Sequence, residues 1–100
     1  MLYYSTMFFV YVLYSEKDHG LYIGFTTNLA NRMREHEEGL SLSTTYRRPL
    51  ILAYYEAYFY REDAETRERF LKSGAGRIFL KKQMRKFFLS HPLRTTIRSS

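Results

Sequence analysis

The chain has 100 residues, of which 45% are hydrophobic and 18% aromatic, so it is long enough to fold around one core and too apolar to be disordered. It contains no cysteine, which excludes disulfides and thiolate metal sites and suits a cytoplasmic protein. The longest apolar run, residues 7–14, is far too short to cross a membrane. We therefore expect neither export nor membrane insertion.

Positive charge is concentrated at the C-terminal end. Residues 1–66 carry six Lys and Arg against nine Asp and Glu, whereas residues 67–100 carry ten Lys and Arg against Glu68 alone. A cationic block of this kind favours a polyanionic partner. Charge alone does not separate nucleic acid from an anionic membrane surface, but for a small cytoplasmic domain we expect nucleic acid.

Three stretches have the composition of β-strands. Residues 8–15 and 21–26 are rich in aromatic and β-branched side chains and are separated by turn residues that end in Gly20, which predicts an antiparallel hairpin. Residues 50–60 return to strand composition and predict a third strand of the same sheet. In the first strand, alternation places Tyr11 on the opposite face from its two valine neighbours.

The first helix is predicted directly after the second strand. Thr27 or Asn28 supplies the cap, and the chain stops being helical near Gly39. Apolar or ring side chains recur along one face of this segment, at Leu29, Met33, His36 and Leu40.

Two more helices are predicted in the C-terminal half. Residues 61–76 begin with acids and end with Lys72, Gly74 and Gly76, an order that suits the helix dipole, and residues 77–89 form a last helix before Pro92. The fold class is therefore α+β, a small three-stranded antiparallel sheet flanked by about three helices. We expect one domain over residues 8–90, a disordered N-terminal extension over residues 1–7 and a C-terminal tail over residues 91–100.

One acidic residue stands where structure alone favours an apolar one. Glu68 shares the inward face of its helix with Ala64 and Leu71. A buried carboxylate needs a partner or a metal. Glu68 is thus either a metal ligand or the partner of Arg67, Lys72 or a tyrosine of the sheet.

Arg32 and His36 also attract notice, because four residues separate them and they project from the same side of the first helix. By themselves they are more typical of structure than of catalysis: a hydrogen-bonded core histidine, and an arginine that meets Glu35, Glu37 or Glu38. Tyr11 and Tyr22 are expected on neighbouring strands of the hairpin, which permits their hydroxyls to share one face with Arg32 just beyond.

These residues together form a recognisable pattern. "FVY" stands at 9–11, "YIG" follows at 22–24, Arg32 comes ten residues after Tyr22 with His36 behind it, and Glu68 lies within "DAETRERFLK". Over residues 8–88 the chain resembles the GIY-YIG nuclease family, in particular its small stand-alone bacterial members, which are related to the N-terminal domain of the bacterial excinuclease C subunit. Phe9 and Val10 replace the family's Gly and Ile, and no asparagine follows Asn31, although some members place one near the metal.

The resemblance implies a metal-dependent endonuclease that hydrolyses phosphodiester bonds in DNA, non-specific or structure-selective, acting in DNA repair or recombination. It implies that one divalent ion, Mg²⁺ or Mn²⁺, is held by Glu68. Arg32 would neutralise phosphoryl oxygens, and Tyr11, with Tyr22 as alternate or co-worker, would orient or deprotonate the attacking water. His36 would position a tyrosine or relay a proton, and Gly24 would keep the phosphate path clear.

The basic end of the chain would bind the nucleic acid backbone without reading its sequence. The side chains expected on the exposed side of the last helix are Arg77, Lys81, Lys82, Arg85 and Lys86, whereas Ile78, Phe79, Met84, Phe87 and Phe88 are expected to pack inward.

Two other functions stay open. The first is a nucleic-acid-binding module with little or no turnover; the second, which leaves the spacing of the polar residues unexplained, is a protein-interaction domain. We expect a monomer or a weak homodimer and no membrane partner.

Overall fold

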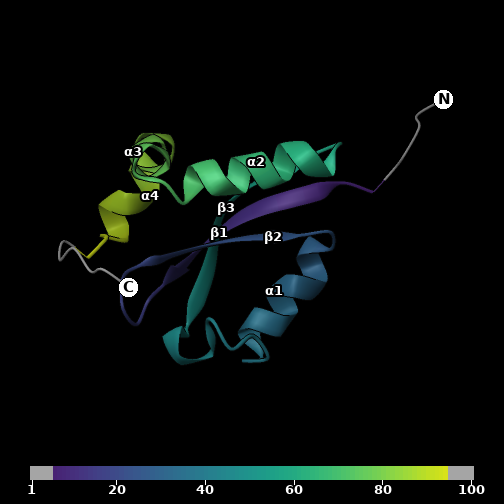
Figure 1. Ribbon diagram of the computed structural model, residues 1–100. Coiled ribbons are helices and arrows are strands. Elements are labelled where there is room, and N and C mark those ends of the chain that lie inside the picture. Colours follow the sequence, from purple (N-terminus) through teal and green to yellow (C-terminus); the bar gives the residue numbers. More distant parts are fainter. Residues whose placement is uncertain (1–5, 95–100) are drawn as a thin grey trace.

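The computed structural model describes residues 6–94, which form a three-stranded antiparallel sheet with helices on both faces (Figure 1). The strands are β1 (Phe8–Ser15), β2 (Leu21–Thr26) and β3 (Leu50–Tyr58), in the order β2-β1-β3. The expected α+β fold class is confirmed. Most of the expected N-terminal extension, residues 1–5, and residues 95–100 of the expected tail lie outside the described residues.

The central strand β1 is covered on both faces, and its side chains from Val10 to Ser15 are buried. On one face, helices α2 (Arg61–Leu71) and α3 (Gly74–Gln83) pack on Val10 and Val12 and form the hydrophobic core. Helix α1 (Leu29–Glu37) lies on the other face, as Figure 1 shows. Because side chains alternate along a strand, Tyr11 faces α1 rather than the core.

Helix α1 begins and ends close to its expected bounds. The side chain of Asn28 caps it by accepting a hydrogen bond of 3.0 Å from the backbone N–H of Asn31. After Glu37 the chain reverses at Gly39, whose positive φ of 78° suits a residue without a side chain. The expectation that Leu40 extends the apolar face is wrong: Leu40 is 65% exposed, because the helix has already ended.

The second helix is shorter than expected. Helix α2 ends at Leu71, and α3 begins at Gly74 with Ser73 as its cap, so Gly74 and Gly76 open a helix instead of ending one. A Cβ atom at Gly76 would overlap the carbonyl oxygen of Phe70, which shows that glycine allows the close approach of α3 to α2.

The last expected helix is divided at Met84 into α3 and α4 (Arg85–Ser90). Met84 is buried as expected, and Leu80 is buried as well, but the expectation that Ile78 packs inward is wrong, because Ile78 is 60% exposed. A short 3-10 helix, η1 (Thr45–Arg47), precedes β3.

Residues 91–94 of the expected tail contact the turn between β1 and β2. The Tyr14 hydroxyl donates a hydrogen bond of 2.7 Å to the carbonyl oxygen of Pro92, and the backbone N–H of Arg94 donates one of 3.0 Å to the carbonyl oxygen of His19. The guanidinium of Arg94 also lies 3.3 Å from a carboxylate oxygen of Asp18. Within residues 6–94, none of the helices combines the length and the apolar character that spanning a membrane requires.

Candidate active site at the edge of the sheet

The phenol of Tyr11 lies over Gly24 on the neighbouring strand. The two residues face each other in the register of β1 and β2, and a Cβ atom at position 24 would overlap the ring and hydroxyl of Tyr11. Gly24 therefore makes room for the Tyr11 side chain itself. This contact explains the glycine more directly than does the clear path for the phosphate that the resemblance implied.

Tyr11 and His36 form a buried hydrogen-bonded pair. The Tyr11 hydroxyl lies 2.8 Å from Nε2 of His36, and Nδ1 of the same ring lies 2.6 Å from Oγ1 of Thr44. Burial lowers the pKa of His36, and the charge of Arg32 lowers it further, so the imidazole is neutral at pH 7. Burial also raises the pKa of Tyr11 to about 12, although Arg32 acts in the opposite direction.

Tyr22 completes an aromatic cluster with these two rings. Its ring centroid lies 6.3 Å from that of Tyr11 and 5.5 Å from that of His36. Its hydroxyl accepts a hydrogen bond of 3.3 Å from Ser43, and this bond lies at the surface. Of the two tyrosine hydroxyls, that of Tyr22 is therefore the one that solvent can reach.

The guanidinium of Arg32 is held in place by two partners. One nitrogen donates a hydrogen bond of 2.9 Å to Glu35, which confirms the expected ion pair, and another donates one of 3.2 Å to Ser41. The carboxylate of Glu35 raises the pKa of Arg32 and Tyr11 raises it further, so the cation is permanent. With 30% of its side chain exposed, Arg32 is accessible to a solute.

The loop after α1 supplies one hydroxyl group to each of Arg32, Tyr22 and His36. Ser41 accepts from Arg32, Ser43 donates to Tyr22 and Thr44 contacts His36. Ser41, Ser43 and Thr44 were not among the site residues predicted from the sequence. The signal was the run of hydroxyl side chains in "SLSTT", directly after the helix that carries Arg32 and His36.

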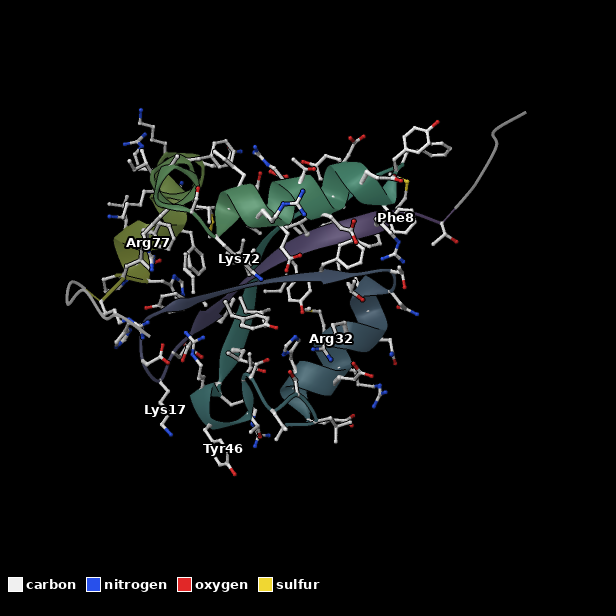
Figure 2. The ribbon with its side chains drawn as sticks, in the orientation of Figure 1. Phe8, Lys17, Arg32, Tyr46, Lys72 and Arg77 are labelled. Atoms are coloured by element: carbon white, nitrogen blue, oxygen red, sulfur yellow. The ribbon has the colours of Figure 1, made fainter. Side chains whose placement is uncertain are left out.

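Glu68 approaches the cluster from α2, on the other side of β2. Its negative charge contributes to the raised pKa of Tyr11, which places the carboxylate within electrostatic reach of the buried phenol. Nζ of Lys72 lies 3.0 Å from Oε2 of Glu68, so the expected pairing with Lys72 is confirmed. In Figure 2, Arg32 lies on the α1 side of the sheet and Lys72 on the side of α2.

The donor set around Glu68 suits a metal ion that is held largely by water and phosphate. Within residues 6–94, no group of three or more His, Asp or Glu side chains is arranged to hold a metal ion. Mg²⁺ is commonly bound through one or two carboxylates together with substrate phosphates. A single half-buried carboxylate that is paired with one exposed lysine fits that mode of binding.

A second carboxylate anchors α2 to the sheet. Glu56 on β3 accepts two hydrogen bonds from Arg67, of 2.9 and 3.1 Å, and one of 2.6 Å from each of the hydroxyls of Tyr54 and Tyr58. Burial raises the pKa of Glu56, but these four hydrogen bonds outweigh burial and hold it below its usual range. Arg67 directly precedes Glu68, so this ion pair fixes the position of Glu68 as well.

The five basic residues expected to bind nucleic acid are all exposed, at Arg77, Lys81, Lys82, Arg85 and Lys86. Only Arg77 is brought next to the cluster, because it lines a cavity together with Tyr22 and Lys72. The other four lie farther along α3 and on α4.

Comparisons with known proteins identify a domain family and relatives of this chain. Residues 7–83 match the model of the GIY-YIG catalytic domain. The chain is 37% identical to a UPF0213 protein of Clostridium perfringens over 67 residues, which cover 66% of this chain and 71% of the relative. It is 40% identical to a UPF0213 protein of Pediococcus acidilactici over 68 residues, which cover 65% and 68%.

The names of these relatives state no activity, and no solved structure matches the chain. The matched domain model spans more than three quarters of the chain and includes all five residues of the site. The chain therefore belongs to the GIY-YIG family, a family of nucleases.

Proposed function

We propose that this protein is a metal-dependent endonuclease that hydrolyses phosphodiester bonds in DNA, without sequence preference or with a preference for particular DNA structures. The observation that supports the proposal best is that the cluster of Tyr11, Tyr22 and His36 lies beside the cation of Arg32 and within electrostatic reach of the carboxylate of Glu68. A role in DNA repair or recombination is part of the same proposal and rests on the resemblance to the excinuclease subunit.

Arg32 binds the scissile phosphate in this account. Its forked nitrogens match two phosphoryl oxygens, and its charge stabilises the negative charge that develops on them during hydrolysis. The hydrogen bond to Ser41 orients the fork before the substrate arrives, whereas the carboxylate of Glu35 occupies a nitrogen that the phosphate must take over. Orientation in advance lowers the barrier, because less reorganisation of the side chain is needed at the moment of reaction.

Tyr11 and Tyr22 have different roles in this proposal. Tyr22 orients the attacking water, because its hydroxyl lies at the surface. Tyr11 is 1% exposed and its pKa is raised to about 12, so it is poorly suited to take a proton from water at neutral pH. We therefore assign Tyr11, with His36, to holding the Tyr22 ring in place, and we assign to Tyr22 the role with the water for which the resemblance favoured Tyr11.

Glu68 is the residue that would hold the divalent ion, Mg²⁺ or Mn²⁺. When bound, such an ion supplies charge neutralisation at the leaving oxygen. The ammonium of Lys72, now paired with Glu68, is then free to contact a phosphate of the same strand.

The test is a cleavage assay with purified protein across a panel of DNA and RNA structures, with Mg²⁺, Mn²⁺ or EDTA. We expect cleavage of DNA that requires the metal and stops with EDTA. A protein that binds the same DNA without cutting any member of the panel would instead be the nucleic-acid-binding module, which the raised pKa of Tyr11 and the pairing of Glu68 with Lys72 also accommodate.

A further inference from the structure

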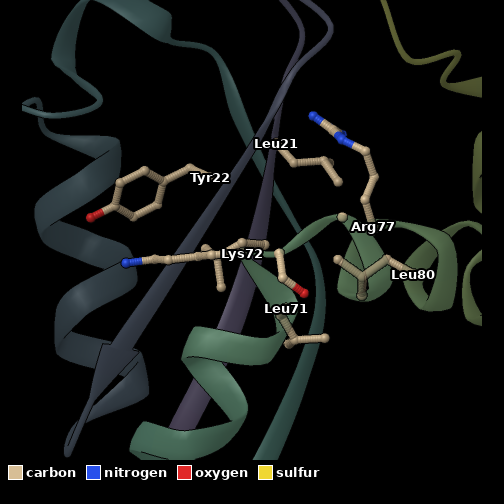
Figure 3. A pocket seen from close by; sticks show the side chains of 9 residues that line it. Leu21, Tyr22, Leu71, Lys72, Arg77 and Leu80 are labelled. Carbon is tan, nitrogen blue, oxygen red and sulfur yellow. The ribbon is translucent and has the colours of Figure 1, made fainter. Parts of the chain in front are cut away.

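A cavity of about 300 Å³ lies along the outer edge of β2, at the corner where α2 turns into α3 (Figure 3). It borders the site described above, because Tyr22 and Lys72 line it. Its lining residues are Leu21, Tyr22, Ile23, Leu71, Lys72, Ser73, Gly74, Arg77 and Leu80. Its volume is at the lower end of the range of small-molecule sites, roughly 300 to 1,000 Å³.

The wall of the cavity combines an apolar surface with two cations. Leu71 and Leu80 are buried and belong to the hydrophobic core, whereas Lys72 and Arg77 are exposed. None of the lining residues is acidic. Within residues 6–94, Arg77 forms no ion pair, so its charge is not neutralised by the described part of the protein.

This combination suits one nucleotide in an unpaired strand. A free phosphate would use the two cations and leave the apolar wall without a contact. A base within a duplex is stacked and cannot enter a cavity. An unpaired nucleotide has both parts: a phosphate for Lys72 and Arg77, and a flat base whose faces can pack against the leucines and the ring of Tyr22.

The position of the cavity relates it to the place where the strand would be cut. Figure 3 shows the side chains of Tyr22 and Lys72 extending in the same direction, toward α1. Lys72 also contacts Glu68. A strand whose phosphate lies beside Glu68 and Lys72 would have its neighbouring nucleotide at the mouth of this cavity.

We propose that the cavity between β2 and the α2–α3 corner binds a single unpaired nucleotide next to the scissile phosphate, so that the protein favours DNA with a single-stranded segment beside a duplex. This inference rests on the proposed function, because it uses the same strand and the same Tyr22.

The experiment measures binding without cleavage, in EDTA, by fluorescence anisotropy. The probes are a blunt DNA duplex and the same duplex with a short single-stranded extension at its 5′ or its 3′ end. We expect the wild-type protein to bind at least one extended duplex about tenfold more tightly than the blunt one, as stacking of one base predicts. Equal affinity for all three probes would overturn the proposal.

Gly74 allows the cavity to be filled. It lines the cavity, and a Cβ atom built there meets no other atom within 4 Å, so a side chain at this position enters open space. Gly74→Phe should remove the preference for the extended duplex and leave binding of the blunt duplex unchanged, whereas the matched Gly74→Ala should keep the preference. Arg77→Gln provides a second test that leaves the corner intact, and it should reduce the preference severalfold.

If both Gly74→Phe and Arg77→Gln keep the full preference, the extension is bound elsewhere and the proposal is wrong. Failure of the proposed function would give a different result. The binding preference would remain, but no probe would be cleaved when Mg²⁺ or Mn²⁺ is added.

Discussion

The hydroxyl of Tyr11 lies 2.8 Å from Nε2 of His36, and both side chains are only 1% exposed. Since Nδ1 of His36 contacts Thr44, both ring nitrogens are satisfied inside the protein. A neutral imidazole can donate at one nitrogen and accept at the other, which matches two hydroxyl partners. An imidazolium donates at both nitrogens, so both hydroxyls would have to accept and neither could donate to the ring.

We expect this pair to make the fold sensitive to mild acid. The folded-state pKa of His36 is lowered by burial, so between that pKa and its usual value near 6.5 the unfolded chain binds more protons than the folded protein. The contribution of His36 to stability is therefore complete above about pH 6.5 and is lost as the pH falls below that value. Urea unfolding from pH 5 to 7 should show a smaller loss for His36→Gln than for the wild type. Parallel curves for the two proteins, with His91→Gln as the control, would contradict the assignment.

The ion pair of Glu56 with Arg67 should be important for stability. Glu56→Ala leaves Arg67 and the hydroxyls of Tyr54 and Tyr58 without their shared acceptor in a half-buried setting. We expect a loss of about 3 kcal/mol in the free energy of unfolding. Glu65→Ala on the exposed surface of α2 is the matched control and should change stability by less than about 1 kcal/mol. Equal effects would show that Glu56 does not anchor the helix.

We expect the carboxylate of Glu35 to weaken the binding of a DNA phosphate by Arg32. Its carboxylate competes with a substrate for the same guanidinium nitrogen. Glu35→Gln should therefore tighten binding of DNA severalfold, measured in EDTA, whereas Glu38→Gln, which removes the equivalent ion pair with Arg34 on the same helix, should not. Weaker binding by Glu35→Gln would mean that the carboxylate serves mainly to orient Arg32.

The basic surface should contribute to binding more than to the chemical step. Replacing Lys81 and Lys82 together by Glu should weaken DNA binding and reduce the slope of log Kd against log salt by about two, since each phosphate contact adds roughly one counterion to the slope. Lys17→Glu, in the turn between β1 and β2, serves as the control for net charge. An unchanged slope in the double variant would place the DNA on another face.

The local parts of the fold could be predicted from the sequence, and so could the family. The first two strands have the expected bounds, because alternating aromatic and β-branched side chains with a glycine turn leave few alternatives. The helix carrying Arg32 and His36 was equally clear from its cap. Their spacing from Tyr22 is what made the family recognisable.

Features that depend on packing could not be predicted in this way. Gly74 and Gly76 have the composition of a helix end, and only the contact with Phe70 shows that Gly76 is needed for the approach of the next helix. The pairing of Glu56 with Arg67 depends on β3 lying beside β1. The burial of Tyr11 was hidden as well, because strand alternation gives the face of a side chain but does not reveal what covers it.

The most direct test of the account is single-turnover cleavage of DNA by the wild type and by Glu68→Gln, with Mg²⁺ and at protein concentrations that saturate binding. We predict that Glu68→Gln binds the DNA as tightly as the wild type does and cuts it roughly 100-fold more slowly or not at all, because the carboxylate that we propose as the metal ligand is lost. Cutting at the wild-type rate by Glu68→Gln would contradict the proposal that Glu68 and its metal ion serve catalysis.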